Sequence, residues 1–147
     1  MALLPPEMDS MEAEAQLFAI GLQESRLKHR RQIGGPARGF WQFEHGGGVR
    51  GVLFHPQTRG HIRAVLSALS YDDSVATSYE AIEHNDLLAC AFARLLLWTL
   101  PQPLPTRGES ASAWQQYLDA WRPGKPHPAK WEENFAQGWK LADERLA

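Results

Sequence analysis

The stretch LLACAFARLLLWTL, Leu87 to Leu100, is the longest apolar segment of the chain and decides its fold class. It has 14 residues and includes the charged Arg94, whereas about 20 apolar residues are needed to span a bilayer. An apolar run of this length is typical of a helix buried in a protein core, and Pro101 would end it. Asn85 or Asp86 is expected to cap its first turn. The segment therefore predicts a helical globular domain without membrane insertion.

Apolar residues recur at helical spacing along most of the remaining chain. Asp9 and Glu12 have the spacing of a capping box and predict the start of a first helix that ends near Leu27. Residues 34–57 are rich in glycine and predict a turn-rich lobe with at most short strands. Further helices are expected over residues 58–69, 74–83, 110–121 and 128–146. The sequence thus predicts a single compact all-α domain over residues 1–147, with an irregular Gly-rich lobe after the first helix.

The composition is that of an ordinary globular protein, with 44% hydrophobic and 22% charged residues. The net charge of −2 argues against a nucleic-acid partner, and the basic run from Lys28 to Arg31 is interpreted as a solvated helix end. Cys90 has no second cysteine to pair with and is expected to be a small core residue. We expect no metal and no cofactor, because the spacing of the nearest histidines matches no metal motif: His45, His55 and His61.

Glu24 is an acid at the end of an apolar helical run. The predicted helix places Leu17, Ile20 and Gly21 on the same side as Glu24, because they precede it by seven, four and three residues. Burial against this apolar stripe would raise the pKa of the carboxyl group, which suits a general acid near neutral pH. The alternative is an ordinary ion pair with Lys28, one helical turn further along.

Two motifs around Glu24 resemble those of one enzyme superfamily. AIGLQESR, residues 19–26, is similar to the first motif of the soluble lytic transglycosylase and goose-type lysozyme superfamily, and GPARGFWQF, residues 35–43, resembles its second motif. The family's third motif, Ala-Tyr-Asn, is matched by Tyr117, but Leu118 stands in place of the asparagine. The resemblance implies a lysozyme-like fold that cleaves the glycan strands of peptidoglycan, with Glu24 as the catalytic acid.

The resemblance also implies roles for other residues of the motifs. Ser25 would hydrogen-bond the acyl group of the sugar, Gly39 would let the backbone approach the sugar, and Gln42 would supply an amide at the wall of the site. The alternatives are a polar helix end, a turn glycine and a surface amide. The predicted substrate-binding set is completed by Phe40, Trp41 and Tyr117.

The family's reaction needs only one carboxyl group. In a lytic transglycosylase the glutamate protonates the leaving oxygen of the MurNAc–GlcNAc β-1,4 bond, and it then takes the proton of the C6 hydroxyl, which closes a 1,6-anhydro ring. A hydrolase would add a second carboxylate that positions a water molecule. Glu44 is the candidate for that role, with Glu80 or Glu83 as the other options. Because Leu118 replaces the family's asparagine, both reactions stay open.

Aromatic residues form two stripes near the C-terminus. Trp114, Tyr117 and Trp121 recur at spacings of three and four, which is typical of a core-facing helix stripe. We expect Tyr117 to line the site and the two tryptophans to belong to the core. The same spacing on the last helix predicts its packing face, formed by Trp131, Phe135 and Trp139.

Residues 114–139 also resemble C-terminal regions of small bacteriophage virion proteins. The N-terminal residues lack the basic and apolar regions of a secretion signal, which predicts synthesis in the host cytoplasm without a signal peptide. A phage particle would then deliver the protein to the periplasm or cell wall. Its partners would be peptidoglycan glycan strands and other virion or tail proteins. The alternatives are a catalytically inactive virion component and an endolysin released through a holin.

Overall fold

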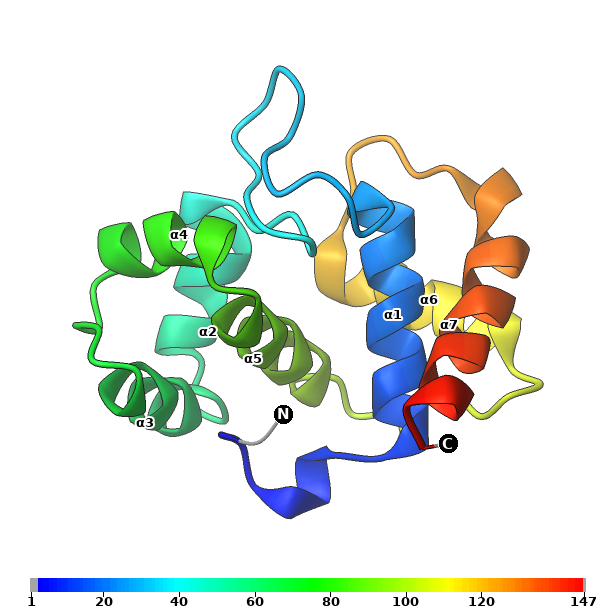
Figure 1. Cartoon of the computed structure of the whole chain (residues 1–147), viewed down its shortest axis with the longest axis horizontal. Coiled ribbons are helices and arrows are strands. Elements are labelled where there is room, and N and C mark those ends of the chain that lie inside the picture. Colours follow the sequence, from blue (N-terminus) through cyan, green and yellow to red (C-terminus); the bar gives the residue numbers. More distant parts are fainter. Residues whose placement is uncertain (1–2, 147) are drawn as a thin grey trace.

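The computed structural model describes residues 3–146, and this part of the chain folds into seven α-helices without a β-strand (Figure 1). Short turns of other helix types occur at Pro6–Met8, His45–Val49 and Pro128–Lys130. The prediction of an all-α fold is confirmed. The helices are α1 (Met11–Ser25), α2 (Arg50–Phe54), α3 (Arg59–Ala68), α4 (Val75–His84), α5 (Asp86–Trp98), α6 (Ser110–Trp121) and α7 (Trp131–Leu146).

Helix α5 is the predicted core helix, and it contacts α1, α2, α3, α4 and α6. Asn85 caps its start, because the side-chain oxygen accepts a hydrogen bond from the Leu88 backbone N–H at 3.1 Å. Seven of its apolar side chains are buried, as expected for a helix enclosed on several sides. Within residues 3–146, no helix has both the length and the apolar character that a membrane crossing requires. The apolar stretch therefore forms the centre of the fold.

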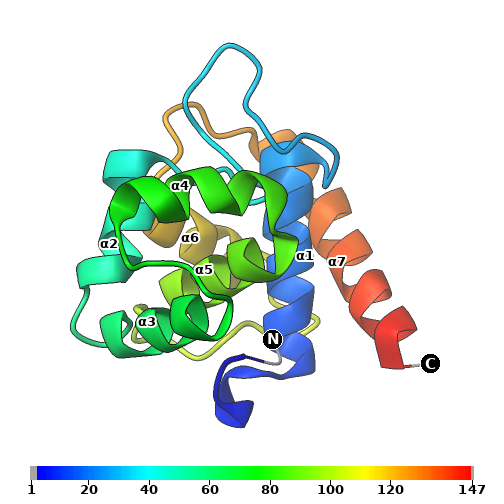
Figure 2. The same ribbon diagram turned by 60° about the vertical axis from the view of Figure 1, so that its left-hand side comes forward.

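Helices α1 and α7 lie side by side (Figures 1 and 2). Gly138 permits their close approach, since a β-carbon there would lie 2.5 Å from the carbonyl oxygen of Ala15 and 2.9 Å from the backbone nitrogen of Ala19. The predicted packing face of α7 is confirmed, because its three aromatic residues are at most 6% exposed: Trp131, Phe135 and Trp139. Helix α7 thereby covers one side of the helix that carries Glu24.

The boundaries of α1 differ from the prediction at both ends. Ser10 caps the start, where its Oγ accepts a hydrogen bond from the Ala13 backbone N–H at 3.0 Å. The expected capping box at Asp9 is wrong, because Asp9 ends the preceding turn and donates its backbone N–H to the Pro6 carbonyl at 3.0 Å. At the other end the helix stops at Ser25, because the next two residues take left-handed backbone angles, φ 58° and φ 54°.

The Gly-rich lobe is less irregular than predicted. Residues 26–44 form a projecting loop at the end of α1 (Figures 1 and 2), held by isolated bridges from Arg38 to Arg31 and Phe43. Residues 50–54, however, form α2, and they follow a π-type turn at residues 45–49 in which Gly47 has non-helical backbone angles, φ −101° and ψ −108°. Glycine has a low helix propensity, so the local sequence favours a loop there. Burial of Val49, Val52 and Leu53 outweighs this preference.

Candidate active site

Glu24 lies in the last turn of α1, half-buried, with its carboxylate turned toward α6. The hydroxyl of Tyr117 donates a hydrogen bond of 2.7 Å to Glu24 Oε2. Burial raises the pKa of Glu24 from 4.5 to about 7, although the hydrogen bond from Tyr117 opposes the increase. The negative charge of Glu44 adds to the increase. A carboxyl group with this pKa exchanges a proton readily at neutral pH.

The Glu24–Lys28 ion pair, the alternative suggested by the sequence, is wrong. Helix α1 ends at Ser25, so Lys28 is not one helical turn beyond Glu24. The backbone N–H of Lys28 donates instead to the Ser25 carbonyl at 3.0 Å, within the turn that follows the helix. Among the described residues, the side chain of Glu24 takes part in no ion pair. Its hydrogen-bonding partner is thus a neutral phenol.

Tyr117 is more enclosed than expected for a residue that lines an open site. It is only 2% exposed, and its ring stacks on Trp131 at a centroid distance of 5.6 Å. Burial and the nearby Glu24 carboxyl raise the pKa of Tyr117, so its hydroxyl stays protonated and acts as a donor. The predicted core residues Trp114 and Trp121 pack against the same ring but are themselves only partly buried. Tyr117 therefore orients the acid from inside the core.

Ser25 joins the end of α1 to the second motif. It is 5% exposed, and its hydroxyl lies 2.6 Å from the carbonyl oxygen of Phe40 and 3.1 Å from that of Gly21. The Oγ also accepts a hydrogen bond from the Leu27 backbone N–H at 3.2 Å. Because the hydroxyl is already hydrogen-bonded to backbone groups, Ser25 links the two motifs and is not on an open surface.

Gly39 and Trp41 face the protein interior. Gly39 has φ +77°, and a β-carbon there would lie 2.9 Å from the carbonyl oxygen of Ile82. The close approach at Gly39 is thus to the backbone of α4, whereas the resemblance implied an approach to the sugar. Trp41 is 7% exposed, and its indole N–H donates a hydrogen bond of 2.8 Å to the Leu17 carbonyl of α1. Both residues fix the lobe against the helices on either side of it.

Phe40 and Gln42, two of the predicted substrate-binding residues, are partly exposed. The guanidinium of Arg30 lies 4.4 Å from the centre of the Phe40 ring, a distance typical of a cation–π contact. Gln42 has φ +55°, and its side-chain amide donates a hydrogen bond of 2.9 Å to the Gly39 carbonyl. Of the predicted substrate-binding residues, these two are thus more exposed than Ser25, Gly39, Trp41 and Tyr117.

Of the three candidates for a second carboxylate, Glu44 is the one whose negative charge raises the pKa of Glu24. It is exposed and immediately precedes the π-turn at residues 45–49. Glu83 is held by Arg31 at 3.1 Å and by Arg38 at 3.2 Å. Glu80 is exposed on α4. Glu83 is thus occupied by structural ion pairs, whereas Glu44 remains the candidate.

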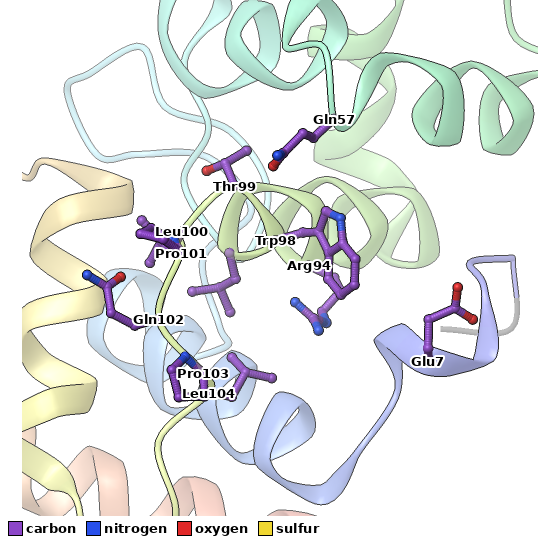
Figure 3. Close-up of a pocket in the computed structure, with 11 residues that line it drawn as sticks. Glu7, Gln57, Arg94, Trp98, Thr99, Leu100, Pro101, Gln102, Pro103 and Leu104 are labelled. Carbon is purple, nitrogen blue, oxygen red and sulfur yellow. The ribbon is translucent and has the colours of Figure 1, made fainter.

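The largest of three cavities in the described part of the chain lies away from this site. It has a volume of about 690 Å³ and lies between the end of α5 and the extended segment 101–104 (Figure 3). Arg94 and Trp98 line it, and the Nε of Arg94 donates a hydrogen bond of 2.6 Å to the Met8 carbonyl. Two smaller cavities adjoin α7, and Glu24 is not among the residues that line these three.

The sequence missed the partner that orients the acid. Tyr117 was recognised from its position in the third motif, but the direct hydrogen bond to Glu24 spans 93 residues and has no local signal. The sequence also missed Gln23, whose amide donates a hydrogen bond of 2.9 Å to the carbonyl of His127. Metal ligands do not gather near these residues: within residues 3–146 no three His, Cys, Asp or Glu side chains form a metal-sized group.

Comparisons of the chain with protein-family models, with curated proteins and with solved structures found no match. The function is therefore inferred from the chemistry of the site and from the motifs in the sequence.

Proposed function

We propose that this protein is a peptidoglycan lytic transglycosylase that cleaves the MurNAc–GlcNAc β-1,4 bond with Glu24 as its acid and base. The observation that carries the proposal is the half-buried Glu24 carboxyl, with a pKa of about 7 and a hydrogen bond from Tyr117. Glycosidic cleavage requires a carboxyl group that is protonated when it meets the leaving oxygen. A glutamate with the ordinary pKa of 4.5 would be ionised at neutral pH.

The proposed reaction uses the same carboxyl group twice. Glu24 donates its proton to the glycosidic oxygen as the bond from that oxygen to C1 of the MurNAc ring breaks. The resulting carboxylate takes the proton of the C6 hydroxyl, and the C6 oxygen bonds to C1 to close the anhydro ring. Tyr117 hydrogen-bonds the carboxylate form, so it stabilises Glu24 between the two proton transfers.

A hydrolytic lysozyme is the second candidate, and Glu44 favours it. Its negative charge is close enough to raise the pKa of Glu24, and its exposed side chain can accept a proton from water. In this reaction water bonds to C1, and the product carries a reducing end in place of the anhydro ring. Glu44 would hold that water on the face opposite Glu24.

Delivery by a phage particle is part of the proposal, and it is supported by the resemblance of residues 114–139 to virion proteins. A virion protein without activity is the remaining alternative. It is favoured by the absence of Glu24 from the three described cavities and by Leu118 in place of the family's asparagine. Mass spectrometry of purified particles would detect a virion component, whereas an endolysin would be found only in the lysate.

The test is turbidity loss of purified peptidoglycan, compared between the wild type, Glu24→Gln and the control Glu144→Gln. Both variants replace a glutamate with glutamine, but Glu144 is exposed on α7 and has no proposed catalytic role. We expect Glu24→Gln to lower the rate at least about a hundredfold, as for the loss of a general acid, and Glu144→Gln to keep it. Fragment masses then separate anhydro products from reducing ends. A folded wild type that leaves the wall intact would support the inactive virion protein.

A further inference from the structure

Positive charge is concentrated in two segments of an otherwise acidic chain. Residues 25–43 and 120–131 contain eight of the fifteen Lys and Arg residues and no Asp or Glu, although the whole chain has a net charge of −2. A charge asymmetry of this kind creates a local positive potential that the overall charge conceals. The basic run at residues 28–31, which the sequence suggested was a solvated helix end, is one part of it.

The two basic segments meet at the end of α1 that carries Glu24. Both project from the same end of the molecule in two views (Figures 1 and 2). The residues on either side of Glu24 hold them there: Gln23 bonds the His127 carbonyl at 2.9 Å, and Ser25 bonds the Phe40 carbonyl at 2.6 Å. The positive segments therefore flank the candidate acid on both sides.

Some of these basic side chains are used within the fold. Arg30 forms an ion pair with Asp86 at 2.7 Å, and Arg31 and Arg38 share Glu83. Among the described residues, none of the remaining five basic side chains of the two segments forms an ion pair, and all five are exposed. We call these five the cationic rim: Arg26, Lys28, Arg122, Lys125 and Lys130.

We propose that the cationic rim binds the carboxylates of an anionic glycan, such as a wall polymer whose sugars carry peptide stems. The inference rests on the proposed function, because it places a charged substrate next to Glu24. Several exposed cations that face one polymer act together, and such attraction increases both affinity and the rate of encounter. The rim thus selects stem-bearing glycan over a neutral glycan with the same backbone.

The surroundings of the rim favour a glycan over a single-stranded nucleic acid. Proteins that bind single strands combine positive charge with exposed aromatic rings on which the bases stack. Here three of the neighbouring aromatic side chains are at most 7% exposed, Trp41, Tyr117 and Trp131, and Arg30 lies over the ring of the partly exposed Phe40. Binding of a polymer with repeated carboxylates requires positive charges but no stacking rings, and the rim provides these charges.

The test measures binding separately from cleavage. The Glu24→Gln protein, which holds its substrate without cutting it, is sedimented with purified peptidoglycan at low and high salt. The rim variant adds Lys28→Glu and Lys125→Glu, and the control adds Arg59→Glu and Lys140→Glu. All four positions are exposed, so both variants carry the same charge change without loss of core packing. A second probe is insoluble chitin, a neutral β-1,4 glycan that carries neither peptide stems nor carboxylates.

We expect the rim variant to bind peptidoglycan about tenfold more weakly at low salt, and the control to bind like its parent. High salt should weaken binding of the parent to peptidoglycan in the same way, since mobile ions screen exposed charges. The parent should bind chitin more weakly than peptidoglycan at low salt. Equal binding by rim variant and control would overturn the proposal, as would tighter binding to a single-stranded oligonucleotide. If the wild type cleaves normally but binding does not depend on salt, the binding role of the rim is refuted and the proposed activity is not. If binding depends on the rim but the wild type does not cleave, the proposed activity is refuted.

Discussion

The two ends of helix α1 each hold a carboxylate, but with different partners. Near the first turn, Glu14 forms an ion pair with Arg145 of α7. In the last turn, Glu24 accepts a hydrogen bond from the neutral hydroxyl of Tyr117 of α6. Within the described part of the chain no cation pairs with Glu24, and burial raises its pKa although the hydrogen bond from the phenol opposes the increase. The same residue type on one helix thus serves as a structural ion at one end and as a candidate acid at the other.

We expect the largest difference between the two ends of α1 in the free energy of unfolding when each glutamate is replaced by glutamine. The pKa of Glu24 rises from 4.5 to about 7 in the folded protein, so the contribution of its protonated form to stability is complete below pH 4.5 and is lost as the pH rises through 7. We expect Glu24→Gln to be more stable than the wild type by about 3 kcal/mol at pH 8, and similar at pH 4. Denaturant unfolding at both pH values measures this.

Glu14→Gln is the matched control for that prediction. It removes an ion pair in which Arg145 is largely exposed, so we expect a cost of less than about 1 kcal/mol. If Glu24→Gln proved less stable than the wild type at pH 8, the comparison between the two ends would fail.

Removal of the phenol hydroxyl tests what orients the acid. Tyr117→Phe keeps the ring that stacks on Trp131 but removes the hydrogen bond that lowers the pKa of Glu24. The pKa of Glu24 should therefore rise, and the decrease of cleavage rate on the alkaline side should move to higher pH. A pH–rate profile measures the shift. Arg145→Gln, at the opposite end of α1, should leave the profile in place, and a shift in both variants would contradict the assignment.

Glu44→Gln should have the smallest effect and the opposite sign. The negative charge of Glu44 raises the pKa of Glu24, and it is the weakest of the three contributions. Its removal should lower that pKa and move the alkaline decrease to lower pH. The same profile also distinguishes the reactions, because a hydrolase that uses Glu44 to position water would lose most of its rate. An unchanged profile would show that Glu44 lies too far away to matter.

The helices could be predicted from the sequence because each has its own local signal. The buried run of α5 and the aromatic face of α7 both follow from residue spacing. Helix α2 has no such signal, because it has only five residues and follows a glycine-rich turn, and its place is fixed by burial of Val49, Val52 and Leu53. Tertiary packing, which a local pattern does not contain, determines such an element.

The site was predictable in its residue types but not in its contacts. Glu24 was found from the apolar stripe behind it, and the structure gives it the raised pKa that this stripe predicts. The hydroxyl of Ser25 and the indole of Trp41 are used by the protein itself, at the carbonyls of Phe40 and Leu17. A sequence shows that a side chain has a donor, but only the fold shows what receives it.

The distance along the chain between Glu24 and Tyr117 has a consequence for how the acid arises. The two residues are 93 positions apart, so α1 leaves the ribosome well before α6 exists. In the nascent chain, Glu24 has the pKa of an ordinary glutamate and is charged at neutral pH. The raised pKa of the candidate acid is therefore a product of tertiary burial, and Glu24 acquires it only when the later parts of the chain have packed around the end of its helix.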